Sequence, residues 1–263
     1  MWNIVKGLNY QLKRDNGIIY IYLIGGFMLG CFVVDYLGSY DMAELTGSFY
    51  GVLHGETCFM ALGILVALLT ARIAGWDYTD KTLNYELMSG HSRGQVYWSR
   101  VWVSLLWSMV TCIIAAFVPI LVFSAINGWG VRADMGGMLL RYGLLMFPLF
   151  RLMSECILLT VLMRNCYMVM IIGFVMYEFS WVFGVMSEPL TNYKLTVQLA
   201  SMNVYRLINF EKSSFAYING EDMIVYETAV EPSFLIGTVI VSLIVGIVCL
   251  LVGYLYFKKS DMD

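Results

Sequence analysis

Three uncharged, apolar stretches of the sequence are long enough to cross a lipid bilayer. They comprise residues 18–34, 101–126 and 233–257. A membrane-spanning helix needs roughly 17 to 25 mostly apolar residues, and it pairs its own backbone amides where no water is available. The chain as a whole is 60% hydrophobic and 13% charged, so folding in water would expose large apolar patches. The sequence therefore predicts an integral membrane protein.

Three further stretches bring the prediction to an all-α integral membrane protein with about six transmembrane helices. We expect one transmembrane domain over residues 1–263, with spans at about 18–37, 52–72, 101–126, 139–163, 167–186 and 233–257. The second span is expected to end at Arg72. Residues 164–166 alone separate the fourth and fifth spans, which predicts a tight antiparallel hairpin. Pro119 and Pro148 lie inside spans, where a missing amide hydrogen bond permits a kink; we expect static kinks, with a hinge at either position as the alternative.

The basic residues of the short loops indicate the orientation of the spans. Cytoplasmic loops of membrane proteins carry an excess of Lys and Arg. With six spans, one side of the membrane holds Lys6, Lys13, Arg14, Arg72, Lys81, Arg93, Arg100, Arg164, Lys258 and Lys259. We therefore expect this side, and with it both termini, to be cytoplasmic.

Two segments outside the spans are expected to fold at the membrane surface or beyond it. Residues 1–14 carry apolar residues at helical spacing between basic ones, namely Trp2, Val5, Leu8 and, less cleanly, Leu12. This pattern is typical of an interfacial helix, with a frayed tail as the alternative. Residues 187–232 form a long outer segment before the last span, in which we expect one or two short helices. The Asn219 and Gly220 pair predicts the turn of a small β-hairpin there.

The loop between the second and third spans is polar and patterned. Thr79 or Asp80 can cap a helix whose apolar face is formed by Leu83, Leu87 and Met88. Gly90 supplies a stop for that helix, and a second helix is expected to start at Ser92. The loop is therefore predicted to hold a short amphipathic helix beneath the membrane.

This loop resembles the inner loop of ABC-2 type permeases. In that family an acidic residue precedes a short Gly-Thr or similar pair, a Leu-containing helix, a Ser-x-x-Ser-Arg turn and a basic residue that opens the third span. The matching residues here are Asp77, Lys81 with Thr82, residues 83–87, residues 89–93, and Arg100. Lys81 departs from the pattern, because Gly is frequent there. The order of interfacial helix, six spans and long outer segment is similar to the family's layout, and the chain resembles bacitracin-export and lantibiotic-immunity permeases of similar length.

The resemblance implies that the chain lies in the bacterial plasma membrane and works with other subunits. It implies that two permease subunits, identical or paralogous, form a dimer and that each binds a separate ABC ATPase subunit. It also implies that an ATPase-coupling helix is formed by Thr79, Asp80, Lys81, Thr82, Leu83, Glu86, Leu87, Ser89, Gly90, Ser92 and Arg93. The chain has no G-x-x-x-x-G-K-[ST] sequence to hold ATP phosphates, so ATP and magnesium are expected on the partner and no cofactor in this chain. An ordinary inner loop that lies on lipid head groups is the alternative.

Charged residues within the fourth and fifth spans need partners, because a lone charge in the bilayer is costly. Arg151 and Glu155 lie in the fourth span and Glu178 in the fifth. Arg151 and Glu178 are about equally far from the turn between these spans, so we expect them to pair, with Glu155 one turn further in. The group is either a buried pair that sets helix register or the polar lining of a proton or translocation route.

Other residue patterns give weaker signals. Gly26 and Gly30 have the G-x-x-x-G spacing that lets helices approach closely, either at the predicted dimer interface or within the chain. His54 and Glu56 lack a third candidate ligand, so no metal site is predicted. The cysteines are expected to be buried, inert thiols, and they are Cys31, Cys58, Cys112, Cys156, Cys166 and Cys249.

The leading hypothesis is a non-catalytic permease subunit of an ATP-driven exporter that moves a hydrophobic or amphipathic compound out of the cell, with an antimicrobial peptide or a drug as candidate cargo. The alternative is an ion-coupled secondary transporter that uses Arg151, Glu155 and Glu178. An intramembrane enzyme is not expected, because the sequence contains neither an H-E-x-x-H motif nor a paired-Asp signature. No pattern indicates nucleic-acid binding.

Overall fold

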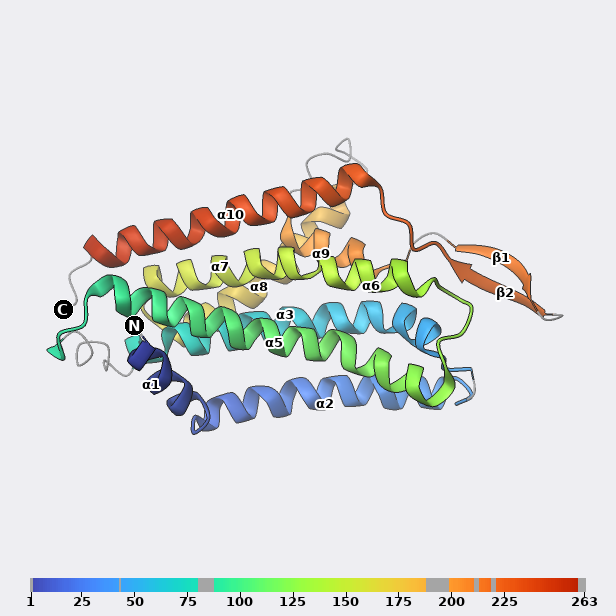
Figure 1. Cartoon of the computed structure of the whole chain (residues 1–263), viewed down its shortest axis with the longest axis horizontal. Coiled ribbons are helices and arrows are strands. Elements are labelled where there is room, and N and C mark those ends of the chain that lie inside the picture. The colour runs from blue at the N-terminus through green and yellow to red at the C-terminus, as the bar shows by residue number, and fades with distance from the viewer. Residues whose placement is uncertain are drawn as a thin grey trace.

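The computed structural model describes residues 2–42, 44–79, 88–187, 199–210, 213–218 and 221–259. Its long helices run side by side in an elongated bundle (Figure 1). Among the described residues, six helical stretches are long and apolar enough to cross a membrane. They are α2 (Asn16–Ser39), α3 (Gly47–Thr79), α5 (Arg93–Asn127), α6 (Met135–Leu144) with α7 (Met146–Met163), α8 (Cys166–Ser187) and α10 (Pro232–Lys259). The predicted all-α membrane fold is confirmed.

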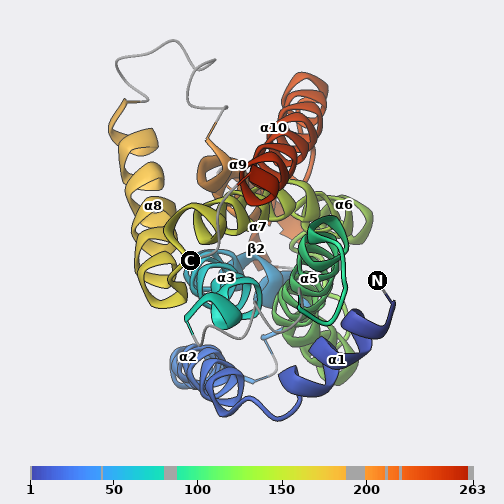
Figure 2. The same ribbon diagram turned by 90° about the vertical axis from the view of Figure 1, so that its left-hand side faces the viewer.

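Helix α3 lies at the centre of the bundle, in contact with α2, α5, α7 and α8 (Figure 2). Of the residues in its spanning segment, 83% are buried inside the protein, whereas only 17% are buried in the spanning segment of α2. A Cβ atom at Gly63 of α3 would collide with the ring of Tyr177 on α8. The Tyr177 hydroxyl donates to the carbonyl of Phe59 at 3.0 Å. A glycine opposite an aromatic ring therefore sets the close packing of α3 and α8.

Helices α3 and α5 each extend beyond the predicted membrane spans. Helix α3 continues past Arg72 to Thr79, and α5 begins at Arg93, ahead of residue 101, where the third span is predicted to begin. Both helices accommodate an arginine at this point, because Arg72 and Arg100 each form an ion pair that is largely shielded from solvent. Ser92 starts α5 as predicted, with a capping box in which its hydroxyl accepts from the backbone amide of Gln95.

The fourth span is divided near its proline, and the third is not. Helix α6 ends at Leu144 and α7 begins at Met146. Pro148 has no amide hydrogen for the carbonyl of Leu144, four residues earlier, which explains a break at this point. Pro119 lies within α5, which continues through it as one helix.

The predicted tight hairpin between the fourth and fifth spans is confirmed. Arg164 ends α7 in the left-handed conformation, with φ of 54°. The side chain of Asn165 then accepts from the backbone amide of Tyr167 at 3.0 Å, which caps α8.

Helix α1 (Trp2–Leu12) confirms the predicted N-terminal helix but not every residue of its buried face. It runs along the edge of the bundle from the start of α2 past α5 (Figure 2), and it buries Ile4, Val5 and Leu8. Val5 and Leu8 of the predicted apolar pattern are thus buried against the protein, whereas Trp2 of the same pattern is 67% exposed. The indole N–H of Trp107 on α5 donates to the side-chain oxygen of Asn9 at 2.7 Å, so this contact also holds α1 on the bundle.

The opposite end of the bundle carries α9 (Ala200–Ile208) and the predicted β-hairpin. Strands β1 (Ser213–Ile218) and β2 (Glu221–Tyr226) are antiparallel, and the hairpin projects beyond the helices (Figure 1). Arg141 of α6 holds the chain that follows β2, because its guanidinium donates to the carbonyls of Thr228 at 2.9 Å and Ala229 at 3.1 Å. We call this the hairpin end, and the end that holds α1 and the last turn of α10 the α1 end.

Candidate functional site

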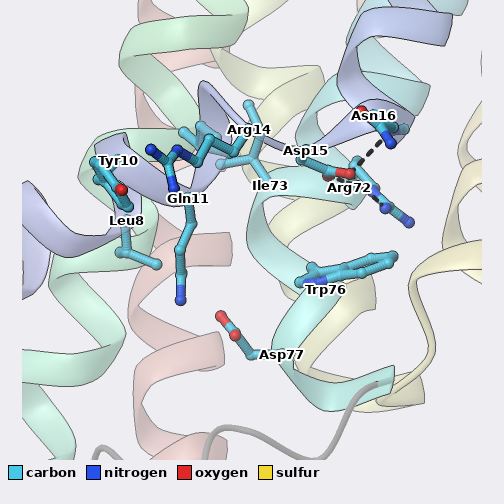
Figure 3. A pocket seen from close by; sticks show the side chains of 12 residues that line it. Leu8, Tyr10, Gln11, Arg14, Asp15, Asn16, Arg72, Ile73, Trp76 and Asp77 are labelled. Carbon is cyan, nitrogen blue, oxygen red and sulfur yellow. Dashed lines mark hydrogen bonds and ion pairs between the residues drawn. The ribbon is translucent and has the colours of Figure 1, made fainter.

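Arg72 joins the central helix to the corner between α1 and α2. Its Nε lies 2.8 Å from Oδ2 of Asp15, and its Nη2 lies 2.8 Å from Oδ1, so the ion pair is bidentate (Figure 3). The guanidinium carbon also lies 3.2 Å from the ring centroid of Trp76, one turn further along α3. A planar guanidinium suits both contacts, and a Lys would not reproduce them.

Asp15 serves two helices at once. Its side chain accepts from the backbone amide of Gly17 at 2.8 Å and thereby caps α2. Burial raises the pKa of the Asp15 carboxyl, but the hydrogen bonds from Arg72 and Gly17 outweigh it and the pKa lies below its ordinary value. The carboxylate is therefore ionised at neutral pH.

A second buried ion pair joins the two helices that flank the inner loop. Nη2 of Arg100 on α5 lies 2.9 Å from Oδ2 of Asp77 on α3, and the two side chains are only 5% and 8% exposed. Both residues belong to the predicted inner-loop pattern, which therefore places its two charges in direct contact. The pair fixes the last turn of α3 against the second turn of α5.

The first turns of α5 are also tied to α10. The Tyr97 hydroxyl donates to the carbonyl of Leu250 at 2.7 Å, and Arg93 donates to the carbonyl of Lys258 at 3.0 Å. The start of α5 is thus held to two further elements, α3 and α10.

An open cavity of about 510 Å³ lies between the α1–α2 corner and the end of α3 (Figure 3). Its walls combine apolar and aromatic side chains with charged and amide groups. The lining residues are Leu8, Tyr10, Gln11, Leu12, Arg14, Asp15, Asn16, Gly17, Arg72, Ile73, Trp76 and Asp77.

The predicted coupling residues are only partly within the described chain. Residues 80–87, which include Asp80, Lys81, Thr82, Leu83, Glu86 and Leu87, lie outside it. Thr79 is the last residue of α3, and Ser89 and Gly90 follow at the far side of the gap. Gly90 has φ of 88°, which suits the predicted glycine stop. The coupling helix itself stays a prediction.

The predicted pair of Arg151 with Glu178 is wrong. Nε of Arg151 instead lies 2.8 Å from Oε1 of Glu155, one turn along the same helix. Together with Tyr177 these two residues line a cavity of about 200 Å³ beside α8. Glu178 follows Tyr177, so it lies about 100° further round the helix and is not part of that lining.

The structure also places the weaker candidates. Gly26 and Gly30 face outward, and a Cβ atom at either would meet nothing within 4 Å, so they do not serve packing within the chain. His54 is buried, with Nε2 3.3 Å from the carbonyl oxygen of Ala115 and Nδ1 3.3 Å from the hydroxyl of Thr57. The expectation of buried cysteines holds for four of the six, because Cys31 is exposed and Cys249 intermediate.

Sequence reasoning missed the partners of Arg72 and Arg100. A charge beside an apolar run normally ends a span, so the sequence places each arginine in a loop, where it indicates the cytoplasmic side. The available signal was an acidic residue beside another span end, namely Asp15 and Asp77. Such pairs can be enumerated from a sequence, but which acid meets which base depends on helix packing.

Comparison with known proteins yields one family. A family model described as an ABC-2 family transporter protein matches residues 10–180, which is more than half of the chain. The match covers α2, α3, α5, α6, α7 and most of α8, and it includes both buried ion pairs. No curated protein matches the chain.

Proposed function

Because the chain belongs to the ABC-2 transporter family, we propose that it is the permease subunit of an ATP-driven exporter in the bacterial plasma membrane. Members of this family generally act as non-catalytic membrane subunits that work with an ABC ATPase. In this proposal a separate ATPase subunit binds residues 79–93 at the α1 end, which faces the cytoplasm. The cargo is a hydrophobic or amphipathic compound that moves outward, and antimicrobial peptides and drugs are the candidates.

The Asp77–Arg100 pair is the observation that supports this proposal best. It clamps the two helices on either side of the inner loop, at 2.9 Å and away from solvent. A push on the loop then moves α3 and α5 as one body instead of bending either helix, which is how a soluble motor can drive a membrane domain. The Asp15–Arg72 pair extends the same rigid unit to the α1–α2 corner.

The proposed dimer uses the outer face of α2. Gly26 and Gly30 are open on that face, so a second permease copy or a paralogue can approach the backbone closely there. The helix is also the least buried of the candidate spans.

The proposal is tested by purifying the tagged chain from native membranes in mild detergent and assaying vanadate-sensitive ATP hydrolysis in the eluate. We expect hydrolysis with the wild-type chain and its loss with Leu83→Asp or Leu87→Asp. Phe215→Ser is the control, because Phe215 is 83% exposed at the hairpin end. An eluate without ATPase subunit or activity contradicts the proposal, as does equal recovery with all variants.

The ion-coupled alternative predicts a different inhibitor profile. It requires transport that an uncoupler abolishes and vanadate leaves intact, with Glu155 and Glu178 as proton carriers. The pairing of Glu155 with Arg151 in the structure favours a structural role for that residue. Vanadate-sensitive export that persists with an uncoupler excludes the alternative.

A further inference from the structure

The cavity at the α1–α2 corner is formed mainly by α1, the start of α2 and α3, and it borders the inner-loop pattern only at Asp77. At about 510 Å³ it falls within the size range of small-molecule sites in proteins. Leu8, Leu12 and Ile73 supply apolar wall, and Tyr10 and Trp76 supply aromatic rings. The ligand that fits such walls is amphiphilic, because a purely ionic ligand leaves the apolar surface uncovered.

The cavity lies where the chain passes from the membrane surface into the bundle. Helix α1 lies at the edge of the bundle beside α5 (Figure 2), and the candidate span α2 begins at Asn16. Trp2 and Tyr10 are 67% and 57% exposed on α1, and such amphipathic aromatic side chains favour the boundary between lipid and water. The cavity is therefore at the depth of the lipid head groups.

The charges around the cavity leave one cation without a carboxylate. Asp15 neutralises Arg72, and Arg100 neutralises Asp77. Among the ion pairs of the described residues none includes Arg14, whose guanidinium carbon lies 4.4 Å from the ring centroid of Tyr10. Counted together with Arg100, which pairs with Asp77 from outside the lining, the group has one positive charge in excess, and this is complementary to an anionic lipid.

We propose that this cavity binds one anionic phospholipid from the leaflet at the α1 end. Arg14 contacts the phosphate, with Gln11 and Asn16 as further hydrogen-bond donors at the rim. The part of the acyl chains nearest the head group lies against Leu8, Leu12 and Ile73. A bound lipid joins α1 to α3 and so strengthens the corner that Asp15 and Arg72 hold. The inference goes beyond the exporter function and does not need the ATPase subunit.

The test uses the full-length purified chain in detergent, without partner. Phosphatidylglycerol, phosphatidylcholine with the same acyl chains, and inorganic phosphate are titrated, with thermal midpoint and native mass spectrometry as readouts. We expect a one-lipid adduct and a raised midpoint with phosphatidylglycerol only. Arg14→Gln should weaken that binding about tenfold, the loss expected for one charge-assisted hydrogen bond.

Lys13→Gln is the matched control, because it removes the same charge from the neighbouring exposed residue, which does not line the cavity. Leu12→Trp, which fills the apolar wall, should also weaken binding of the lipid, and its thermal midpoint without lipid is measured alongside to confirm that the variant is folded. Equal loss in Arg14→Gln and Lys13→Gln indicates diffuse surface attraction and overturns the proposal. Equal stabilisation by inorganic phosphate or by phosphatidylcholine overturns it too.

Discussion

Arg72 meets the carboxylate of Asp15 through two contacts of 2.8 Å, although 57 positions separate these residues in the chain. The contact joins the N-cap of α2 to the central helix α3, which therefore continues as a helix beyond a charge that would otherwise end a span. The α1–α2 corner, the end of α3 and the start of α5 form one connected unit, because Asp77 and Arg100 add the next link.

The Asp15–Arg72 pair is expected to show strong coupling in a double-mutant cycle. Asp15→Asn and Arg72→Gln should each lower the free energy of unfolding in detergent by about 1 to 3 kcal/mol, because each leaves a partly buried charge alone. The double variant should lose less than the sum of the two. Additive losses contradict the pairing.

The same pair has a defined pH dependence. The pKa of Asp15 is lowered in the folded chain, so its contribution to stability is complete above the ordinary carboxyl pKa of about 4 and is lost as the pH falls through the lowered value. We expect the difference in unfolding free energy between wild type and Asp15→Asn to stay constant from about pH 8 to about pH 5 and to shrink below it. A difference that already shrinks between pH 7 and pH 5 contradicts this account.

The Asp77–Arg100 pair should be essential for both stability and coupling. Asp77→Asn or Arg100→Gln should destabilise the chain by about 3 to 5 kcal/mol, because each leaves a buried charge without its partner. The exchanged variant, Asp77→Arg with Arg100→Asp, should recover part of the thermal midpoint. If the exchange is no better than either single change, the direct contact is not the cause of the loss.

Arg141 is expected to control the hairpin end. Arg141→Lys cannot reproduce the fork of donors to the carbonyls of Thr228 and Ala229, so residues 221–229 should exchange amide hydrogens faster. Hydrogen-exchange mass spectrometry measures this directly. Phe215→Ser, an exposed change on the same hairpin, should leave that rate unchanged, and equal rates in Arg141→Lys and wild type refute the anchoring role.

Two glycines with opposite surroundings provide a matched comparison. Gly63→Ala forces a methyl group into the ring of Tyr177 and should lower the unfolding free energy by about 1 to 3 kcal/mol. Gly26→Ala meets nothing within 4 Å and should leave the monomer unaffected. Thermal midpoints in detergent distinguish them, and a destabilised Gly26→Ala monomer contradicts the outward orientation of that face.

The number and approximate position of the spans could be predicted, because long uncharged runs can satisfy their backbone only as membrane helices. The hairpin turn at Asn165, the left-handed backbone at Gly90 and the cap at Ser92 could also be predicted from local rules. The continuation of α3 beyond Arg72 could not, because the charge of Arg72 is balanced by Asp15 at the start of another helix. Arg151 and Glu178 are equally far from the turn, which predicts a similar depth for both but not the direction in which each side chain points. The predicted pairing of these two residues was therefore wrong.

The most direct test of the central claim is site-specific crosslinking from the inner loop in native membranes. A photoreactive residue at position 89 should crosslink to an ATP-hydrolysing subunit, with a yield that changes when ATP and vanadate are added. The same residue at position 215, at the hairpin end, should give no such product. Crosslinking from position 215 but not from position 89, or an ATPase crosslink from neither, would contradict the coupling role of the loop.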